Sequence, residues 1–456
     1  MDRFEQNYWG LFADFLEGFK EWTYNGHPLA FGIHFYSLLK DRVDLERNLL
    51  HPSYIKTGRG GQKVVDAYLP DYEWKNTKGK VVFYDKLLRI PSSVYPVLVP
   101  LSESILLKSD VTNIRSTPVQ GMEMVGLIGN KANGEESVRK VEKSFSAIAT
   151  RFHSHPLFGK KNVHTQVKKQ ISKYMKYLNA AEHFFEKTEV SLLIMGETNS
   201  LDTRSLAMTA RKKGIPTICL QHGAIVSSFG YLPKIAIYQG VYGLYEQAFY
   251  QSAGVDARYL PIIGHPRFDG ITSNQHMNPS LFYKQTQTDR KRKRLLIVDH
   301  HTDKSKNLKI IDGLLKKVPE TELILKIQKG SQAYNHYAKH PRVHIVTRMN
   351  LEDLLSYSDA VISYESTVVL EALLAGKRTF VWKLNQAGLT DYFSKLPVER
   401  YIDVGELVDD VVTYINEGKQ THVPTEEVRK SFYIPERSSS TLLLKALIQN
   451  IRSKAD

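Results

Sequence analysis

The sequence predicts an α/β protein of two doubly wound domains that face a cleft, with an extra helical or mixed segment at the N-terminus. From residue 188 onward, short apolar runs alternate with helical stretches, which is typical of parallel strand–helix–strand units. A basic stretch near 275–294 interrupts this alternation and divides it into two halves. The length of 456 residues suits two or three domains at roughly 100–200 residues each.

An amphipathic helix is predicted at the start of the N-terminal segment, because large apolar side chains recur there at spacings of three and four residues. Such a stripe either packs on its own domain, which we expect, or touches a membrane. Residues 51–80 have the composition of a loop, and 130–175 are expected to be helical with loops. Short strands are predicted at Val81–Tyr84 and Val97–Val99. The stripe consists of Trp9, Leu11, Phe12, Phe15, Leu16 and Phe19.

The two halves show the same alternation. In the first half, strands are predicted at Val190–Met195, Ile215–Leu220, Ile235–Tyr238 and Tyr259–Ile263, with a helix at Ser200–Lys212. In the second half, strands are predicted at Leu295–Val298, Glu322–Lys326, Val343–Val346, Ala360–Ile362 and Thr379–Val381, and helices at Leu308–Lys317, Leu351–Tyr357 and Thr367–Leu374.

These patterns divide the chain into four segments. Residues 1–275 form an N-terminal domain with its extension, 276–294 a basic linker, and 295–435 a C-terminal domain. Residues 436–456 form a terminal helix, predicted from an apolar periodicity behind Ser and Thr. We expect this helix to pack back on the N-terminal domain.

Composition narrows the partners and the compartment. Lys and Arg exceed Asp and Glu by 62 to 48, a net charge of +14, which suggests an anionic partner: nucleic acid, membrane or phosphate-bearing small molecules. The run 290–294 suits a solvated linker better than a nucleic-acid contact, because no RNA-binding signature combines basic and aromatic residues. The single cysteine, Cys219, excludes an intramolecular disulfide and is expected in the core. We expect a cytoplasmic protein, since no apolar run is long enough for a membrane span and no signal-peptide pattern is present.

The first candidate motif opens a helix directly after the predicted strand Ala360–Ile362. Ligands of doubly wound sheets bind at the carboxyl ends of the strands. The hydroxyls of Ser366 and Thr367 and the first-turn amides of the helix suit a phosphate. Glu371 lies one turn further on the same face and can accept from ribose hydroxyls. The alternative is a capped helix with a solvated glutamate.

Three candidates of the first half also follow predicted strands. Gly264 begins a tight turn in which Arg267 can present a bidentate fork to a diphosphate or carboxylate, although a structural turn with an Arg–Asp pair is the alternative. His222 precedes a glycine and suits a general base or a hydrogen-bond donor to a phosphate, whereas a lone histidine is usually structural. Glu197, after the preceding strand, is a rival base.

Two further loops of the second half are candidates. Lys326 and Lys329 could neutralise a phosphate or could be solvated lysines. His300 lies in an Asp-His-His-Thr-Asp loop, in which adjacent residues rarely converge on a metal, so we expect a donor-site loop and no metal site. Walker A, dinucleotide-fingerprint, His-Glu-x-x-His and Asp-x-Asp motifs are absent.

The order and spacing of these motifs resemble the two-domain (GT-B) transferases of bacterial surface polysaccharides. That group contains capsule-biosynthesis glycosyltransferases and the CDP-glycerol glycerophosphotransferases of teichoic acid synthesis. The resemblance implies two Rossmann-like domains, with the acceptor in 1–275 and a donor nucleotide in 295–435, where Thr347, Arg348 and Met349 would border the base. It covers about 188–385 and rests on Ile218–Gly223, Gly264–Asp269, Ser358–Ser363, Ser366-Thr367 and Glu371-Ala372.

The resemblance implies a metal-independent, cofactor-free transfer of sugar from a nucleotide sugar to a cell-surface polysaccharide or lipid-linked glycan. His222 or Glu197 would take the acceptor proton, and Arg267 would stabilise the departing phosphate. Expected partners include an anionic membrane at the inner face of the cell but no nucleic acid. Glycerophosphotransferases carry Lys-Pro-His-Pro where this chain has Lys326-Ile327-Gln328-Lys329, which favours sugar transfer. A glycerophosphotransferase, a nucleotide-sugar epimerase and a non-enzymatic anion binder remain alternatives.

Overall fold

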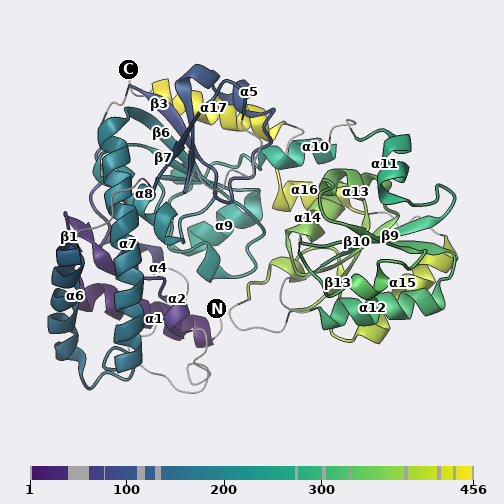
Figure 1. Cartoon of the computed structure of the whole chain (residues 1–456), viewed down its shortest axis with the longest axis horizontal. Coiled ribbons are helices and arrows are strands. Elements are labelled where there is room, and N and C mark those ends of the chain that lie inside the picture. The colour runs from purple at the N-terminus through teal and green to yellow at the C-terminus, as the bar shows by residue number, and fades with distance from the viewer. Residues whose placement is uncertain are drawn as a thin grey trace. The chain divides into compact units, whose positions relative to one another are not determined.

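Two six-stranded parallel sheets organise the chain in a computed structural model, one sheet in each of two compact units (Figure 1). Unit 1 comprises residues 1–267, 387–389 and 437–456, and unit 2 comprises 268–386 and 390–436. The structure describes residues 3–39, 61–75, 78–109, 119–128, 135–272, 276–299, 304–328, 330–384, 389–418, 423–434 and 438–453.

Both sheets have the same doubly wound strand order. In unit 1 the order is β5-β4-β3-β6-β7-β8, and in unit 2 it is β11-β10-β9-β12-β13-β14. Successive strands are therefore added first toward one edge of each sheet and then toward the other. The order reverses between β3 and β6 in unit 1 and between β9 and β12 in unit 2. These are the topological switch points at which such folds bind ligands. The strands are β3 Lys80–Tyr84, β4 Ser104–Lys108, β5 Glu123–Gly126, β6 Val190–Met195, β7 Thr217–Leu220, β8 Tyr238–Gly240, β9 Lys293–Val298, β10 Thr321–Lys326, β11 Val343–Val346, β12 Ala360–Tyr364, β13 Arg378–Trp382 and β14 Glu399–Tyr401.

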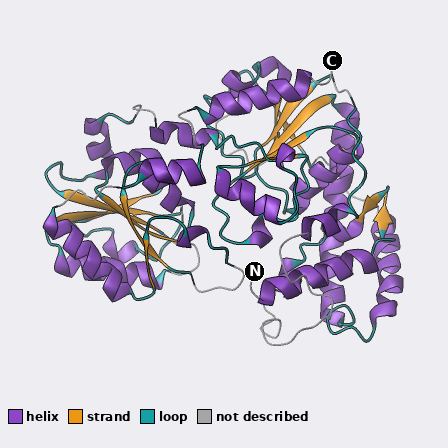
Figure 2. Cartoon of the chain, turned by 180° about the vertical axis from the view of Figure 1, so that it is seen from behind, coloured by secondary structure: helices purple, strands orange, loops and turns teal. Residues whose placement is uncertain are grey.

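Helices cover both faces of each sheet, as Figure 2 shows with helices in purple and strands in orange. This architecture confirms the predicted pair of Rossmann-like α/β domains and the helical N-terminal segment. Unit 1 contains a short β1–β2 hairpin, Thr23–Tyr24 and His27–Pro28, and the helices α1 Arg3–Gly18, α2 Tyr36–Leu39, α4 Gly61–Asp66, α5 Tyr95–Leu98, α6 Glu135–Ala149, α7 Lys161–Lys187, α8 Leu201–Lys212, α9 Leu244–Ser252 and α17 Ser440–Ser453. Unit 2 contains α10 Asp269–Thr272, α11 Pro279–Thr286, α12 Ser305–Lys317, α13 Leu351–Tyr357, α14 Thr367–Leu374, α15 Val404–Glu417 and α16 Thr425–Phe432.

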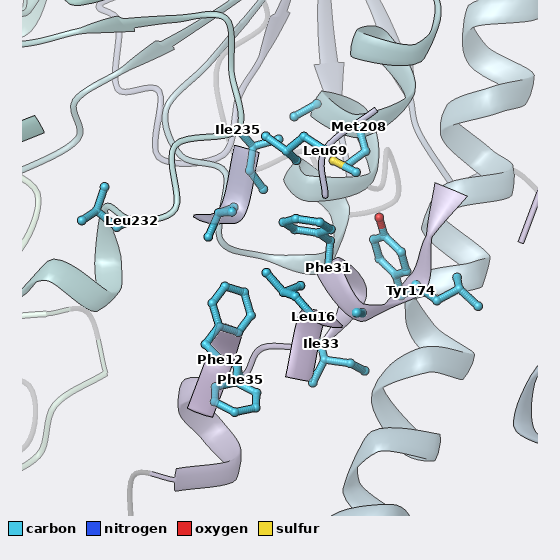
Figure 3. Packing of buried hydrophobic residues seen from close by; sticks show 14 of the residues in the cluster. Phe12, Leu16, Phe31, Ile33, Phe35, Leu69, Tyr174, Met208, Leu232 and Ile235 are labelled. Carbon is cyan, nitrogen blue, oxygen red and sulfur yellow. The ribbon is translucent and has the colours of Figure 1, made fainter. Parts of the chain in front are cut away.

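The aromatic stripe of α1 is part of the unit 1 core. Phe12, Phe15 and Phe19 are at most 2% exposed. Phe12 packs on Phe35 with ring centroids 5.2 Å apart, and Figure 3 shows these rings beside Leu16 and Phe31. The prediction that this stripe packs on its own domain is therefore confirmed, and these side chains are not a membrane-contacting surface.

A buried arginine joins this N-terminal extension to the loop after β6. Arg204 on α8 is 4% exposed. Its guanidinium donates to the carbonyls of Phe31 at 3.0 Å and Ile33 at 3.4 Å in the extension. It also donates to the Thr198 carbonyl at 3.1 Å and the Asn199 side-chain oxygen at 3.0 Å. One cation thus satisfies acceptors of two segments that lie far apart in sequence.

Three strand predictions are wrong. Val97–Val99 overlaps the helical turn α5, which has Pro96 in its first turn and from which Val97 points to solvent at 41% exposure. Tyr259–Ile263 forms a 3-10 turn and a single bridge between Val241 and Ile262, because Pro261 has no N–H to donate to a ladder.

The third error concerns the strand expected at Ile235–Tyr238. The strand observed in its place is Tyr238–Gly240, since the amide of Ile237 donates to the Thr217 hydroxyl instead of to a strand. In the expected loop 51–80, residues 51–60 lie outside the described residues, but 61–66 form α4.

The stretch 276–294 contains folded structure in unit 2. Helix α11 lies within it, and Phe282 is fully buried against β9 and α13 residues. Two side chains of the basic run 290–294 make hydrogen bonds within unit 2. Arg294 donates to the carbonyls of Tyr357 at 2.6 Å and Arg292 at 2.7 Å, and Lys293 donates to the carbonyl of Ile415 at 2.8 Å. At the other end of the chain, α17 belongs to unit 1 and packs on α5 and β6.

Within the described ranges, no helix is long and apolar enough to cross a membrane. Cys219 is buried in β7, and burial raises the pKa of its thiol to about 12. It is a core residue, as its place in the sequence predicts.

Replacing Arg204 with Met should destabilise unit 1 strongly. The substitution keeps much of the side-chain volume but leaves the carbonyls of Phe31 and Thr198 buried without their donor, so we expect a loss of about 3 kcal/mol or more. Urea unfolding measures this loss. Arg258→Met is the matched control, because its side chain is 71% exposed. Equal unfolding midpoints for the two variants would contradict the structural role of Arg204.

Candidate functional site

Four loops converge at the carboxyl edge of the unit 1 sheet. They follow β3, β6, β7 and the bridge at Ile262, and they carry Arg89, Glu197, His222 and Arg267. The loops after β3 and β6 flank the switch point of this sheet. The charges of Arg89, Glu197 and Arg267 all influence the pKa of His222, which shows that the structure brings these side chains together.

The ring of His222 is held in one orientation. Its Nδ1 lies 3.1 Å from the Gly196 carbonyl, and the ring stacks on Tyr231 at 5.0 Å and 10°. Because a carbonyl oxygen can only accept, Nδ1 carries the proton and Nε2 is the nitrogen able to accept one. Burial, followed by the positive charge of Arg89, lowers the pKa of His222. A neutral imidazole with a basic Nε2 is the form that a general base requires.

Gly196 permits this arrangement by close backbone approach. A Cβ at this position would lie 2.4 Å from the backbone of Leu87, which no side chain can accommodate without a shift of the loop. The loop after β3 and the loop after β6 are thus in direct contact, and the Gly196 carbonyl is fixed where it meets His222.

Arg89 is a candidate residue that the sequence did not single out. Its guanidinium donates to the His222 backbone carbonyl at 3.3 Å, and its side chain is exposed. Arg89 and Leu87 both adopt left-handed backbone angles, with φ of +52° and +54°, which are costly for residues with side chains. The available sequence signal was an arginine shortly after the predicted strand Val81–Tyr84.

Glu197 is buried and occupied by its own loop. One carboxylate oxygen accepts from the amides of Asn199 at 2.5 Å and Ser200 at 2.9 Å, and the other from the Thr203 hydroxyl at 3.0 Å. The carboxylate therefore caps the start of α8, where a negative charge is favourable. This arrangement holds the loop in place and engages both oxygens of the predicted rival base.

The turn from Gly264 to Arg267 is rigid. Gly264 has φ of +63°, which favours glycine. His265 is fully buried, donates from Nε2 to the Leu88 carbonyl at 3.0 Å and accepts at Nδ1 from the Arg267 amide at 3.2 Å. Burial holds the pKa of His265 well below its usual value, so it stays neutral. The Arg267 guanidinium donates to the Tyr242 hydroxyl at 3.3 Å.

The unit 2 candidates lie around the carboxyl ends of β10, β11 and β12. Ser366 is the residue before α14, in extended conformation, with its hydroxyl 3.3 Å from that of Ser363. Glu371 is buried at 6% exposure in the same helix, and Thr367 is its first residue. The hydroxyls and first-turn amides of α14 are therefore grouped at a strand end, as predicted, beside the switch point between β9 and β12.

Lys326 supports the neighbouring loop. Its ammonium donates to the carbonyls of Thr347 at 3.1 Å and Met349 at 2.7 Å. Burial lowers its pKa. Two of its three donors are thus engaged, whereas Thr347 and Arg348 expose their side chains. Lys326 and the predicted base-bordering residues form one local structure.

Two predicted site residues, His300 and Lys329, lie outside the described residues. Asp299, directly before His300, is buried and accepts from Lys304 and Tyr334. Among the described residues, no group of three or more His, Cys, Asp or Glu side chains is arranged to hold a metal ion.

Comparison with known proteins identifies the fold. No family model and no curated protein sequence matches the chain. Solved structures do match: the wall teichoic acid polymerase TagF with CDPG, at 14% identity and a TM-score of 0.51, covers 86% of this chain and 93% of that one. A complex of S. aureus MnaA with UDP, at 10% identity and a TM-score of 0.53, covers 83% and 97%. A putative UDP-N-acetylglucosamine 2-epimerase from Listeria monocytogenes, at 10% identity and 0.51, covers 83% and 96%.

These likenesses show that the chain has the GT-B fold. The resemblance seen in the motifs is thereby confirmed at the level of the fold.

Replacing Arg89 with Gln should raise the pKa of His222. The positive charge of Arg89 disfavours a second charge on the imidazole, so its removal makes protonation easier and moves the titration to higher pH. An NMR titration of the histidine ring signals measures the shift. Lys143→Gln on α6 is the control for loss of one charge. An unchanged or lower His222 pKa in the Arg89 variant would contradict this electrostatic coupling.

Proposed function

We propose that this protein is a metal-independent glycosyltransferase that moves a sugar from a nucleotide-activated donor to a cell-surface polysaccharide or lipid-linked glycan. The observation that carries the proposal is the oriented, neutral His222, which follows β7 and contacts Gly196 beside the switch point of the unit 1 sheet. Its Nε2 suits removal of a proton from an acceptor hydroxyl. The GT-B fold supports an enzyme that handles an activated nucleotide.

Unit 2 binds the donor in this proposal. The first-turn amides of α14 and the hydroxyls of Ser366 and Thr367 hold the phosphates, because a helix N-terminus carries partial positive charge. Glu371 contacts the ribose, and Arg348 and Met349 border the base. The fold relatives MnaA and TagF were solved with UDP and CDPG, which supports a pyrimidine nucleotide as the first ligand to test.

Unit 1 binds the acceptor in this proposal. His222 takes the acceptor proton as the new glycosidic bond forms, which gives an inverting transfer, and Arg267 stabilises charge on the departing phosphate. Glu197 keeps the loop after β6 in shape instead of exchanging a proton, because its oxygens already accept hydrogen bonds from Asn199, Ser200 and Thr203. No metal ion or organic cofactor enters, so EDTA should leave transfer unchanged.

Glycerophosphate transfer and epimerisation are the two alternative reactions, because the fold relatives include a teichoic acid polymerase and a putative epimerase. A glycerophosphotransferase would consume CDP-glycerol, although Gln328 stands where that group carries the histidine of its Lys-Pro-His-Pro motif. An epimerase would convert the nucleotide sugar without an acceptor. Comparing CDP-glycerol with sugar nucleotides, with and without acceptor, separates the three.

Nucleotides should raise the melting temperature of the protein. A ligand that binds the folded state alone stabilises it by about 2.7 kcal/mol at a hundred times its dissociation constant. A thermal-shift panel of UDP, CDP, GDP and ADP and their sugars measures the rise in melting temperature and identifies the base that the protein prefers. Thr367→Val should reduce the shift, whereas Thr413→Val, in α15, should not. A panel without any shift would contradict a donor site in unit 2.

Substituting His222 by Gln should slow transfer by roughly a hundredfold to ten-thousandfold and leave donor binding intact, since a general base contributes that much. Initial rates with the nucleotide sugar that the thermal-shift panel identifies, and with a lipid-linked glycan as acceptor, measure the effect. His153→Gln, an exposed histidine, is the control.

A contrast with Glu197→Gln separates the two predicted bases. The amide retains oxygen and volume, so we expect its main effect on stability and a smaller one on rate. Full activity of the His222 variant together with loss in the Glu197 variant would reverse the assignment.

A further inference from the structure

The outer face of helix α7 has a concentration of uncompensated lysines. The helix has 27 residues, which gives a length of roughly 40 Å. One side is buried in the unit 1 core through Val167, Ile171 and Tyr174. The opposite side exposes Lys169, Lys173 and Lys176, at spacings of four and three residues. Lys161, the first residue of the helix, is also exposed. Figure 1 shows α7 along the outside of unit 1.

Acidic residues are missing from this part of the sequence. Between Glu142 and Glu182 the chain has eight Lys or Arg residues and no Asp or Glu. Glu182, where acidic residues resume, is engaged with Asn25 and His27. No hydrogen bond or ion pair joins the ammonium groups of Lys169, Lys173 and Lys176 to any side chain in the ranges that the structure describes. Their charge is therefore directed at solvent.

This face differs from the other basic segment, 290–294. There, Arg294 and Lys293 donate to backbone carbonyls of their own unit. On α7 the cations are lysines, which attract anions as solvated point charges without the fixed geometry of a guanidinium. A straight helix with such charges suits an extended anionic surface better than one small anion.

We propose that the lysine face of α7 docks unit 1 on an anionic lipid bilayer without insertion. The exposed residues between 161 and 176 include no aromatic or large apolar side chain, so the face lacks both the stacking groups that hold single-stranded nucleic acid and a hydrophobic anchor. Charge complementarity with phosphate headgroups remains, and each lysine near such a surface strengthens binding roughly fivefold. The lysines of this face are not among the residues whose charges influence the pKa of His222, and the docking does not depend on the reaction assigned to His222.

Sedimentation with vesicles tests the docking. The full chain should bind vesicles of equal parts phosphatidylglycerol and phosphatidylcholine, should not bind phosphatidylcholine alone, and should be released by salt. Lys169→Gln/Lys173→Gln/Lys176→Gln should weaken binding on the order of a hundredfold. The matched control is Lys309→Gln/Lys316→Gln/Lys339→Gln on unit 2, which lowers the net charge of +14 by the same three and should bind nearly as the natural chain does.

The outcomes are distinct. Equal loss in both triple variants would show a net-charge effect and overturn the assignment to α7, as would no binding to the phosphatidylglycerol vesicles. Binding of single-stranded RNA that depends on the same three lysines, without vesicle binding, would replace the membrane by a nucleic acid. Nucleotide-induced thermal shifts are measured on the same variants and should be unchanged, so a failure here is separable from a failure of the proposed transfer.

Discussion

A buried guanidinium connects the parts of unit 1 on which the candidate site depends. Arg204 satisfies carbonyl groups of the N-terminal extension and of the loop that follows β6. Burying a cation is costly unless its donors are all matched, and burial does lower the pKa of this arginine. The match requires the extension, α8 and the loop to be assembled together. The aromatic α1 segment is thus structurally linked to the site although it contributes no candidate residue.

From that constraint the geometry of the His222 loop follows. Arg204 positions Thr198 and Asn199, Glu197 caps α8 beside them, and the Gly196 carbonyl orients the imidazole. Each of these contacts is made by backbone or by a buried polar group with a defined partner. A site built in this way is preorganised, because its polar groups need no rearrangement when a ligand binds.

The positive charge of the chain serves different purposes in different places. Arg294 satisfies the carbonyls of Tyr357 and Arg292, and Lys326 satisfies carbonyls in the loop after β11. Burial lowers the pKa of Lys326, which indicates a structural environment for that ammonium. On α7, by contrast, the lysines are solvated. Net charge alone could not separate these cases, since it counts a carbonyl-bound cation and a free one equally.

The sequence by itself determined the α/β class, most strands of unit 2, the position of His222 after a strand, and the helix after β12 that carries Thr367 and Glu371. These features depend on local apolar periodicity and on residues adjacent in the chain, such as the helix start at Thr367. The tertiary structure decided the rest. Strands β4 and β5 and the contribution of Arg89 depend on contacts between segments far apart in sequence, as Gly196 against Leu87 shows. The spacing of residues along a chain carries no record of such contacts, because they form when separate loops meet at one edge of a sheet.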